Sequence, residues 1–109
     1  MQVYINFDTG KATLQPSAEL VLRDLLAALN GRPELRVDLI GHTDAVGSAS
    51  HNQDLSARRA GTVLTWLVQH GIVPSRLHSG GRGSTEPIAD NKSELGRALN
   101  RRVEVKALN

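Results

Sequence analysis

The apolar residues of this chain change their spacing several times, from alternation to helical periodicity and back, and this order constrains the fold most. Residues 3–7 are β-branched and aromatic with partial alternation, which is typical of a strand. Residues 35–40 and 103–107 alternate in the same way, while residues 77–81 show a shorter and weaker strand pattern. We therefore expect four strands, the third of them short.

A first helix is expected between the first two strands. The apolar residues from Leu20 to Leu29 follow near-helical spacing, Pro16 stands where a first helical turn tolerates proline, and Gly31 follows the last turn. Residues 82–94 are rich in Gly, Ser, Thr, Pro, Asp and Asn, which predicts a loop. Residues 96–100 after it are expected to make one short helical turn.

The second helix is expected to follow the second strand. One buried stripe has the i, i+3, i+4, i+7, i+8 spacing and consists of Ala60, Val63, Leu64, Leu67 and Val68. Its start is open between a long helix capped by Ser48 or Ser50 and a shorter helix capped by Ser56. We favour the long helix, because Asn52 and Leu55 are then in phase with the stripe.

The resulting order is β-α-β-α-β-(short helical turn)-β, which predicts an α+β fold in which helices cover a sheet. A length of 109 residues suits one domain, so we expect a single domain over residues 1–109. Aromatic residues make up only 3%, and the core must therefore consist of Leu, Val, Ile and Ala. The absence of cysteine excludes disulfides and thiolate chemistry. No apolar run approaches the ~18–20 residues of a membrane span, so we expect any export signal or anchor to lie outside this chain.

Two charged residues are placed where a ligand could meet them. Asp44 follows the carboxyl end of a buried strand, which is where α/β proteins tend to bind ligands, and Arg59 lies on the helix that comes next. Asn52 shares a helix face with Arg59 within about 20°, because the two are seven residues apart. Such a set can bind a zwitterion, with Asp44 accepting from the ammonium and Arg59 donating to the carboxylate. The alternative is an Asp44–Arg59 ion pair that only ties strand to helix, and the pattern by itself does not choose.

A longer ordered set of residues resembles a known family. The first group is Gly41, His42, Thr43, Asp44, Gly47, Asn52, Leu55, Ser56, Arg59, Ala60, Val63, Leu67 and Gly71. The second group is Arg76, Leu77, Gly81, Gly83, 87–91, Gly96, Arg97 and 100–104, and residues 7–9 resemble the first strand and turn. Together they are similar to OmpA-like C-terminal domains, a family that spans outer-membrane protein A, the peptidoglycan-associated lipoproteins and MotB-type stator proteins.

The resemblance implies a function and a set of contacts. It implies a four-stranded mixed sheet and noncovalent, non-enzymatic binding of peptidoglycan in the periplasm, with no cofactor. Asp44 and Arg59 would hold the zwitterionic end of meso-diaminopimelate in the peptide stem. Asn52 and Arg101 would contribute, and Thr43 and Asp8 would line the same pocket. We expect the parent to be a larger, membrane-anchored envelope protein, in which this domain serves as the anchor to the cell wall.

The residue patterns disfavour several other functions. Catalysis is disfavoured because no Gly-x-Ser-x-Gly motif is present and no second carboxylate is evidently paired with Asp44. A metal site is disfavoured because the four histidines show no ligand spacing. The glycine-rich residues 80–83 lack the Gly-Lys-Ser/Thr ending of a phosphate loop.

Charge and composition also bear on nucleic-acid and protein partners. The net charge of +2 would suit nucleic acid as well as cell wall, but three aromatic residues offer few stacking platforms, so we expect no nucleic-acid binding. A protein–protein scaffold or dimerization domain with little wall binding stays open as the alternative function. A homodimer is compatible with either.

Overall fold

The computed structural model describes residues 3–109 as four strands, three α-helices and one 3-10 turn. In chain order they are β1 (Val3–Asn6), α1 (Ala18–Gly31), β2 (Val37–His42), α2 (Ala49–Gln69), the turn η1 (Pro74–Arg76), β3 (Leu77–Gly81), α3 (Glu94–Asn100) and β4 (Arg102–Ala107). The predicted α+β order is confirmed.

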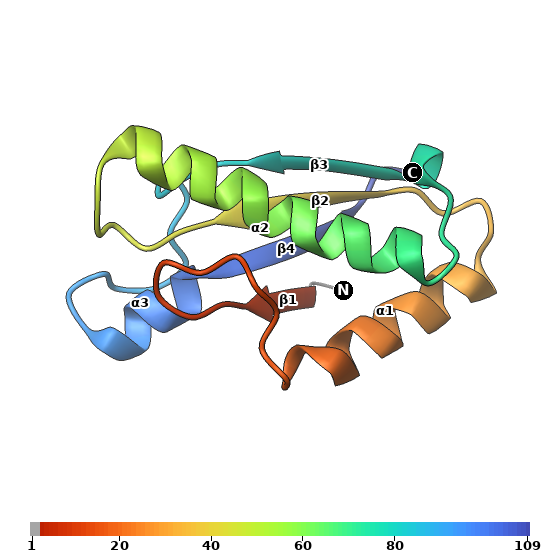
Figure 1. The fold of residues 1–109 in the computed structure, drawn as a ribbon, viewed down its shortest axis with the longest axis horizontal. Helices are drawn as coiled ribbons and strands as arrows, with labels where there is room; N and C mark the ends of the chain where they lie inside the picture. Colours follow the sequence, from red (N-terminus) through yellow and green to blue (C-terminus); the bar gives the residue numbers. More distant parts are fainter. Residues whose placement is uncertain (1–2) are drawn as a thin grey trace.

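The four strands form one mixed sheet in the order β1-β4-β2-β3 (Figure 1). β4 pairs antiparallel with both β1 and β2, whereas β2 and β3 are parallel and are joined through α2. A parallel pair requires such a crossover connection, and the long helix provides it. α2 packs on β2 and β3, and α1 packs beside β1. One end of the molecule, on the left in Figure 1, holds the carboxyl ends of β1, β2 and β3, the amino end of β4, residues 7–12 and α3.

The core lies between the two long helices and one face of the sheet. The stripe predicted on α2 supplies Ala60, Val63 and Leu67, and α1 adds Leu22, Leu25 and Leu29. The strands contribute alternate residues, which are Val3, Ile5, Val37, Leu39, Val103 and Val105. The predicted aliphatic core is therefore present, with Phe7 and Trp66 as its aromatic members.

The structure settles the helix boundaries that the sequence left open. α2 is the long helix, because the Ser48 hydroxyl accepts a hydrogen bond from the His51 amide at 3.1 Å. α3 begins two residues earlier than expected, since the Ser93 hydroxyl caps it by accepting from the Gly96 amide at 3.0 Å. α1 begins at Ala18, after a separate turn that includes Pro16.

Glycines let α2 approach the sheet closely and so set the position of its charged residues. Gly41 lies within β2, and a Cβ there would come within 2.7 Å of the Ser56 carbonyl carbon. A Cβ on Gly81 in β3 would lie 2.6 Å from the Ala57 amide nitrogen. The Ser56 hydroxyl donates to the Gln53 carbonyl and accepts from the Gly83 amide. Backbone contact between α2 and two strands therefore brings the helix face with Arg59 against the strand ends.

Across residues 3–109, no helix has both the length and the apolar composition that a bilayer-spanning segment requires.

Candidate functional site

Most of the predicted contact residues meet at one end of the sheet. Asp44 follows β2, Arg101 connects α3 to β4, and Asp8 lies just after β1. β1 and β2 both terminate at this end of the sheet and β4 begins there, since β4 is antiparallel to each of them. Arg59 points from α2 toward the same end, as its hydrogen bonds to the carbonyls of Asp8 and His42 show.

Asp44 is buried, with 6% of its surface exposed, and its carboxylate is held by two neighbours. Oδ1 accepts from the Val46 amide at 3.0 Å, which closes a tight turn after the strand, and Oδ2 accepts from Arg101 Nη1 at 3.1 Å. Within residues 3–109, Asp44 thus forms its ion pair with Arg101, and the alternative Asp44–Arg59 ion pair is not formed. The carboxylate still has lone pairs for a further donor.

Arg59 is completely buried, and its guanidinium donates to three main-chain carbonyls. Nε donates to Lys11 at 2.8 Å, Nη1 to His42 at 3.0 Å and Nη2 to Asp8 at 2.9 Å. Burial lowers the pKa of Arg59 to about 10, although the charge of Asp44 acts to raise it. Arg59 therefore stays charged at neutral pH, and each Nη keeps a second N–H.

Arg101 joins three parts of the chain. Its Nε donates to the Phe7 carbonyl at 3.1 Å, Nη1 to Asp44 at 3.1 Å, and Nη2 to Glu94 Oε1 at 2.8 Å. Burial acts to lower the pKa of Arg101, but the hydrogen bonds to Glu94 and Asp44 outweigh it and raise that pKa. The guanidinium is therefore a fixed positive charge next to Asp44.

The other three predicted residues are placed differently from one another. Thr43 is buried and its hydroxyl donates to the Asp44 carbonyl at 2.8 Å. Asn52 is buried on α2, with its amide oxygen beside Gly47 in the loop that carries Asp44. Asp8 is exposed, and its carboxylate accepts from Gln15 while only its carbonyl meets Arg59. The structure brings Asp44, Arg59 and Arg101 into one charged cluster, with Thr43 and Asn52 in the loop and helix that border it.

Glu94 belongs to this cluster and was missed from the sequence. Its carboxylate holds Arg101 Nη2 through Oε1 and contacts Arg97 through Oε2 at 3.3 Å. The available signal was Ser93, a good helix cap, followed by an acidic residue in the first turn. We expected the helix to begin at residue 96, which left Glu94 in the loop.

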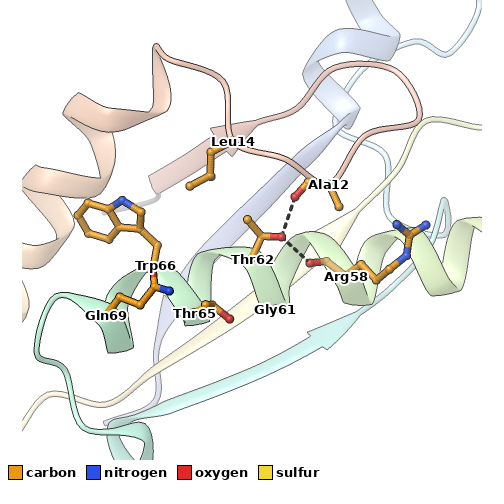
Figure 2. Close-up of a pocket in the computed structure, with 8 residues that line it drawn as sticks. All are labelled: Ala12, Leu14, Arg58, Gly61, Thr62, Thr65, Trp66 and Gln69. Atoms are coloured by element: carbon orange, nitrogen blue, oxygen red, sulfur yellow. Dashed lines mark hydrogen bonds between the residues drawn. The ribbon is translucent and has the colours of Figure 1, made fainter.

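A separate groove of about 580 Å³ lies between α2 and residues 12–14 (Figure 2). Arg58 stands near one end and Trp66 near the other, and Thr62 Oγ1 between them donates to the Ala12 carbonyl at 2.6 Å. His70 stacks on the Trp66 ring at 3.7 Å, so this ring is already engaged within the protein. None of the residues of the charged cluster lines the groove, and the candidate site stays at Asp44.

A polar cluster lies under the site, on the sheet face away from α2. His42 is 1% exposed, its Nε2 lies 3.2 Å from Glu104 Oε1, and it pairs across the strands with Arg102. Its Nδ1 has no hydrogen-bond partner among residues 3–109. Burial and the charge of Arg102 lower the pKa of His42 from 6.5, against the opposing effect of Glu104. No group of three or more potential metal ligands occurs in residues 3–109.

The free energy of unfolding is expected to fall as the pH drops from about 7.5 to about 5.5, partly because of His42. The unfolded chain takes up this proton near pH 6.5, whereas the folded protein takes it up at a lower pH, so acid favours unfolding. Urea unfolding of His42→Gln at several pH values in this range should show a free energy of unfolding that depends less steeply on pH than that of the wild type. His51→Gln, which removes an exposed histidine of α2, is the control and should keep the wild-type slope. An unchanged slope in His42→Gln would contradict this account.

Comparison with known proteins shows what the chain is similar to. A family model described as "OmpA family" matches residues 6–101. The chain is 39% identical over 104 residues to outer membrane porin F of Pseudomonas fluorescens, which is 95% of this chain and 32% of that protein. It is 40% identical over 101 residues to the peptidoglycan-binding protein ArfA of Mycobacterium tuberculosis, 93% of this chain and 31% of that protein. The chain thus spans about a third of the length of these two relatives.

The fold has solved counterparts as well. The cell wall anchor of the T6SS from Pseudomonas aeruginosa superposes with a TM-score of 0.79 at 31% identity, over 95% of this chain and 78% of that one. The superposition therefore includes nearly the entire chain.

Proposed function

The chain belongs to the OmpA family, and we propose that it binds peptidoglycan noncovalently and anchors a parent envelope protein to the cell wall. Two relatives support this proposal by what they are, a peptidoglycan-binding protein and a cell wall anchor. The observation that carries it is the buried cluster in which Asp44 and Arg101 are paired beside the charged Arg59. Because the relatives are longer, the parent is proposed to be a larger protein with this domain in the periplasm.

The proposed ligand is the diaminopimelate residue of the peptide stem. Its side chain ends in an amino-acid centre, with an ammonium and a carboxylate on the same carbon. Asp44 would accept from the ammonium, and Arg59 and Arg101 supply positive charge for the carboxylate. A lysine-type stem has the ammonium without this carboxylate, so it would leave the arginines without an ionic partner from the ligand.

The burial of Arg59 adds a requirement to this mode of binding. The guanidinium has no exposed surface, and two of its three carbonyl partners, from Asp8 and Lys11, belong to the segment between β1 and α1. A ligand carboxylate therefore reaches Arg59 only when part of residues 8–11 shifts. Arg101 and Asp44, each 6% exposed, would be met first.

Asp44→Asn is expected to weaken binding to diaminopimelate-type sacculi by at least about 30-fold, because it removes one charge of a buried pair. Asn keeps the oxygen that accepts from Val46 but turns an amide nitrogen toward Arg101, so we expect the fold to be retained with some loss of stability, which thermal unfolding would measure. Co-sedimentation with purified sacculi measures the loss. The control is Asp54→Asn, the same change at an exposed aspartate paired with Arg58, and it should bind as the wild type does.

Titration with free meso-diaminopimelate, followed by NMR, would locate the contact. Shifts are expected in residues 8–11 and 43–46 and at Arg59 and Arg101. Full binding by Asp44→Asn would refute the site. Shifts confined to other regions would favour the scaffold or dimerization function instead. Release of soluble fragments from sacculi would contradict binding without turnover.

A further inference from the structure

Arg101 is held by two buried partners and one exposed partner. The Phe7 carbonyl and the Asp44 carboxylate take Nε and Nη1, and both lie in the buried edge of the sheet. The third contact, from Nη2, goes to Glu94, whose side chain is 64% exposed. The two buried contacts already fix the plane of the guanidinium, so Glu94 is not needed to orient Arg101. Of the three partners of Arg101, Glu94 is the one whose side chain is open to solvent.

Glu94 can move away from Arg101 and still keep an ion-pair partner. Its other carboxylate oxygen contacts Arg97 three residues later on α3, at 3.3 Å. Arg97 is itself anchored, because Nη1 donates to the Asn91 carbonyl at 3.0 Å. Hydrogen bonds from Arg101 and then Arg97 lower the pKa of Glu94, so it is a carboxylate at neutral pH. A partly exposed ion pair of this kind is weak, and a competing anion can replace it.

The charges of the cluster also bear on which ligands it accepts. Asp44 and Glu94 carry two negative charges, while Arg59 and Arg101 carry two positive charges. With Glu94 in place the cluster is neutral, which disfavours a ligand with excess negative charge. When Glu94 has turned to Arg97, the cluster proper is left with one excess positive charge.

We propose that Glu94 acts as an internal competitor for the site, occupying the Nη2 edge of Arg101 until a carboxylate of the ligand displaces it. This inference rests on the proposed function, since it concerns the same site. This competition makes Glu94 a specificity-determining residue, because it lowers the affinity of the site for ligands that bring only a single carboxylate. A stem peptide with two carboxylates near one ammonium can satisfy Arg59 and displace Glu94 from Arg101 at once.

The test compares variants of Glu94 in calorimetric titrations with the tripeptide L-Ala-γ-D-Glu-meso-diaminopimelate at low salt. Glu94→Gln and Glu94→Ala should both bind it roughly two- to fivefold more tightly than the wild type, the range of one exposed ion pair. Added salt should reduce the difference, because the contact is exposed. The control is Glu19→Gln, which makes the same charge change in an exposed pair with Arg23 on α1 and should leave the affinity unchanged.

The outcomes separate this inference from the proposed function. If the wild type binds the tripeptide and neither Glu94 variant binds it more tightly, the competitor role is overturned and the proposal of peptidoglycan binding is unaffected. Weaker binding by Glu94→Ala with normal binding by Glu94→Gln also overturns it, because Glu94 would then position Arg101 through a hydrogen bond. No binding of the tripeptide by any of the proteins overturns both proposals together.

Discussion

Gly41→Ala is expected to lower the free energy of unfolding by on the order of 3 kcal/mol or more. The new methyl group would overlap the Ser56 carbonyl oxygen and come within 2.7 Å of the carbonyl carbon. Both of these atoms belong to the backbone of α2. Neither can move aside as a flexible side chain can, so the helix must lift away from β2. Because α2 also carries Arg59, the same displacement should weaken peptidoglycan binding. Urea unfolding and sacculus co-sedimentation measure the two effects.

The matched control is Gly80→Ala, at a strand glycine that is the register partner of Ile40 in the same parallel pair. A Cβ there meets nothing within 4 Å, so the substitution should cost little and could even stabilise the strand. If Gly41→Ala were as stable as Gly80→Ala, the close approach of α2 to β2 would not be a requirement of the fold.

Arg59→Met is expected to destabilise the protein by roughly 3–5 kcal/mol in addition to abolishing binding. Methionine replaces the apolar stem of arginine but has no donors, so the carbonyls of Asp8, Lys11 and His42 lose their hydrogen bonds inside the protein. Two of these carbonyls hold the segment after β1 against α2, and this segment should loosen first. Amide hydrogen exchange in residues 8–12, together with urea unfolding, measures the effect.

Arg58→Met makes the same chemical change one residue earlier on α2. Arg58 is exposed, and within residues 3–109 its side chain pairs with Asp54 alone, a contact worth about 1 kcal/mol or less. Its variant should therefore keep near-wild-type stability and binding. Equal losses from Arg58→Met and Arg59→Met would show that general positive charge on α2 matters, and not the three carbonyl contacts.

An Arg59 variant is a poor test of ligand binding, because Arg59 also has a structural role. The sequence suggested a ligand contact or an ion pair with Asp44, whereas the structure shows an arginine that also ties β1, β2 and α2 together. Loss of binding in an Arg59 variant would therefore mix a chemical effect with a structural one. Asp44→Asn is the cleaner test, because it breaks one side-chain contact, the ion pair with Arg101, and retains the turn hydrogen bond from Val46.

Much of the fold could be predicted because its signals are local. The stripe from Ala60 to Val68 and the alternation in residues 35–40 and 103–107 needed only neighbouring residues to be recognised. The boundary of α3 was wrong by two residues, because a single Ser-Glu pair at the end of a polar loop is a weak signal. The alternation that predicts the second strand covers residues 35–40 and does not include Gly41, which lies inside β2 and directly beside Ser56 of α2.

The sequence by itself determined the order of elements, the buried stripes, the charged residue that follows β2 and the charged residue on the buried face of α2, since periodicity and residue type are properties of short segments. Only the tertiary structure decided which partner each charge has. Arg59 bonds to carbonyls 51, 48 and 17 residues away, and every residue carries such a carbonyl, so no sequence pattern marks these three. Asp44 likewise pairs with an arginine 57 residues away because β4 runs antiparallel beside β2 and places Arg101 at the same edge.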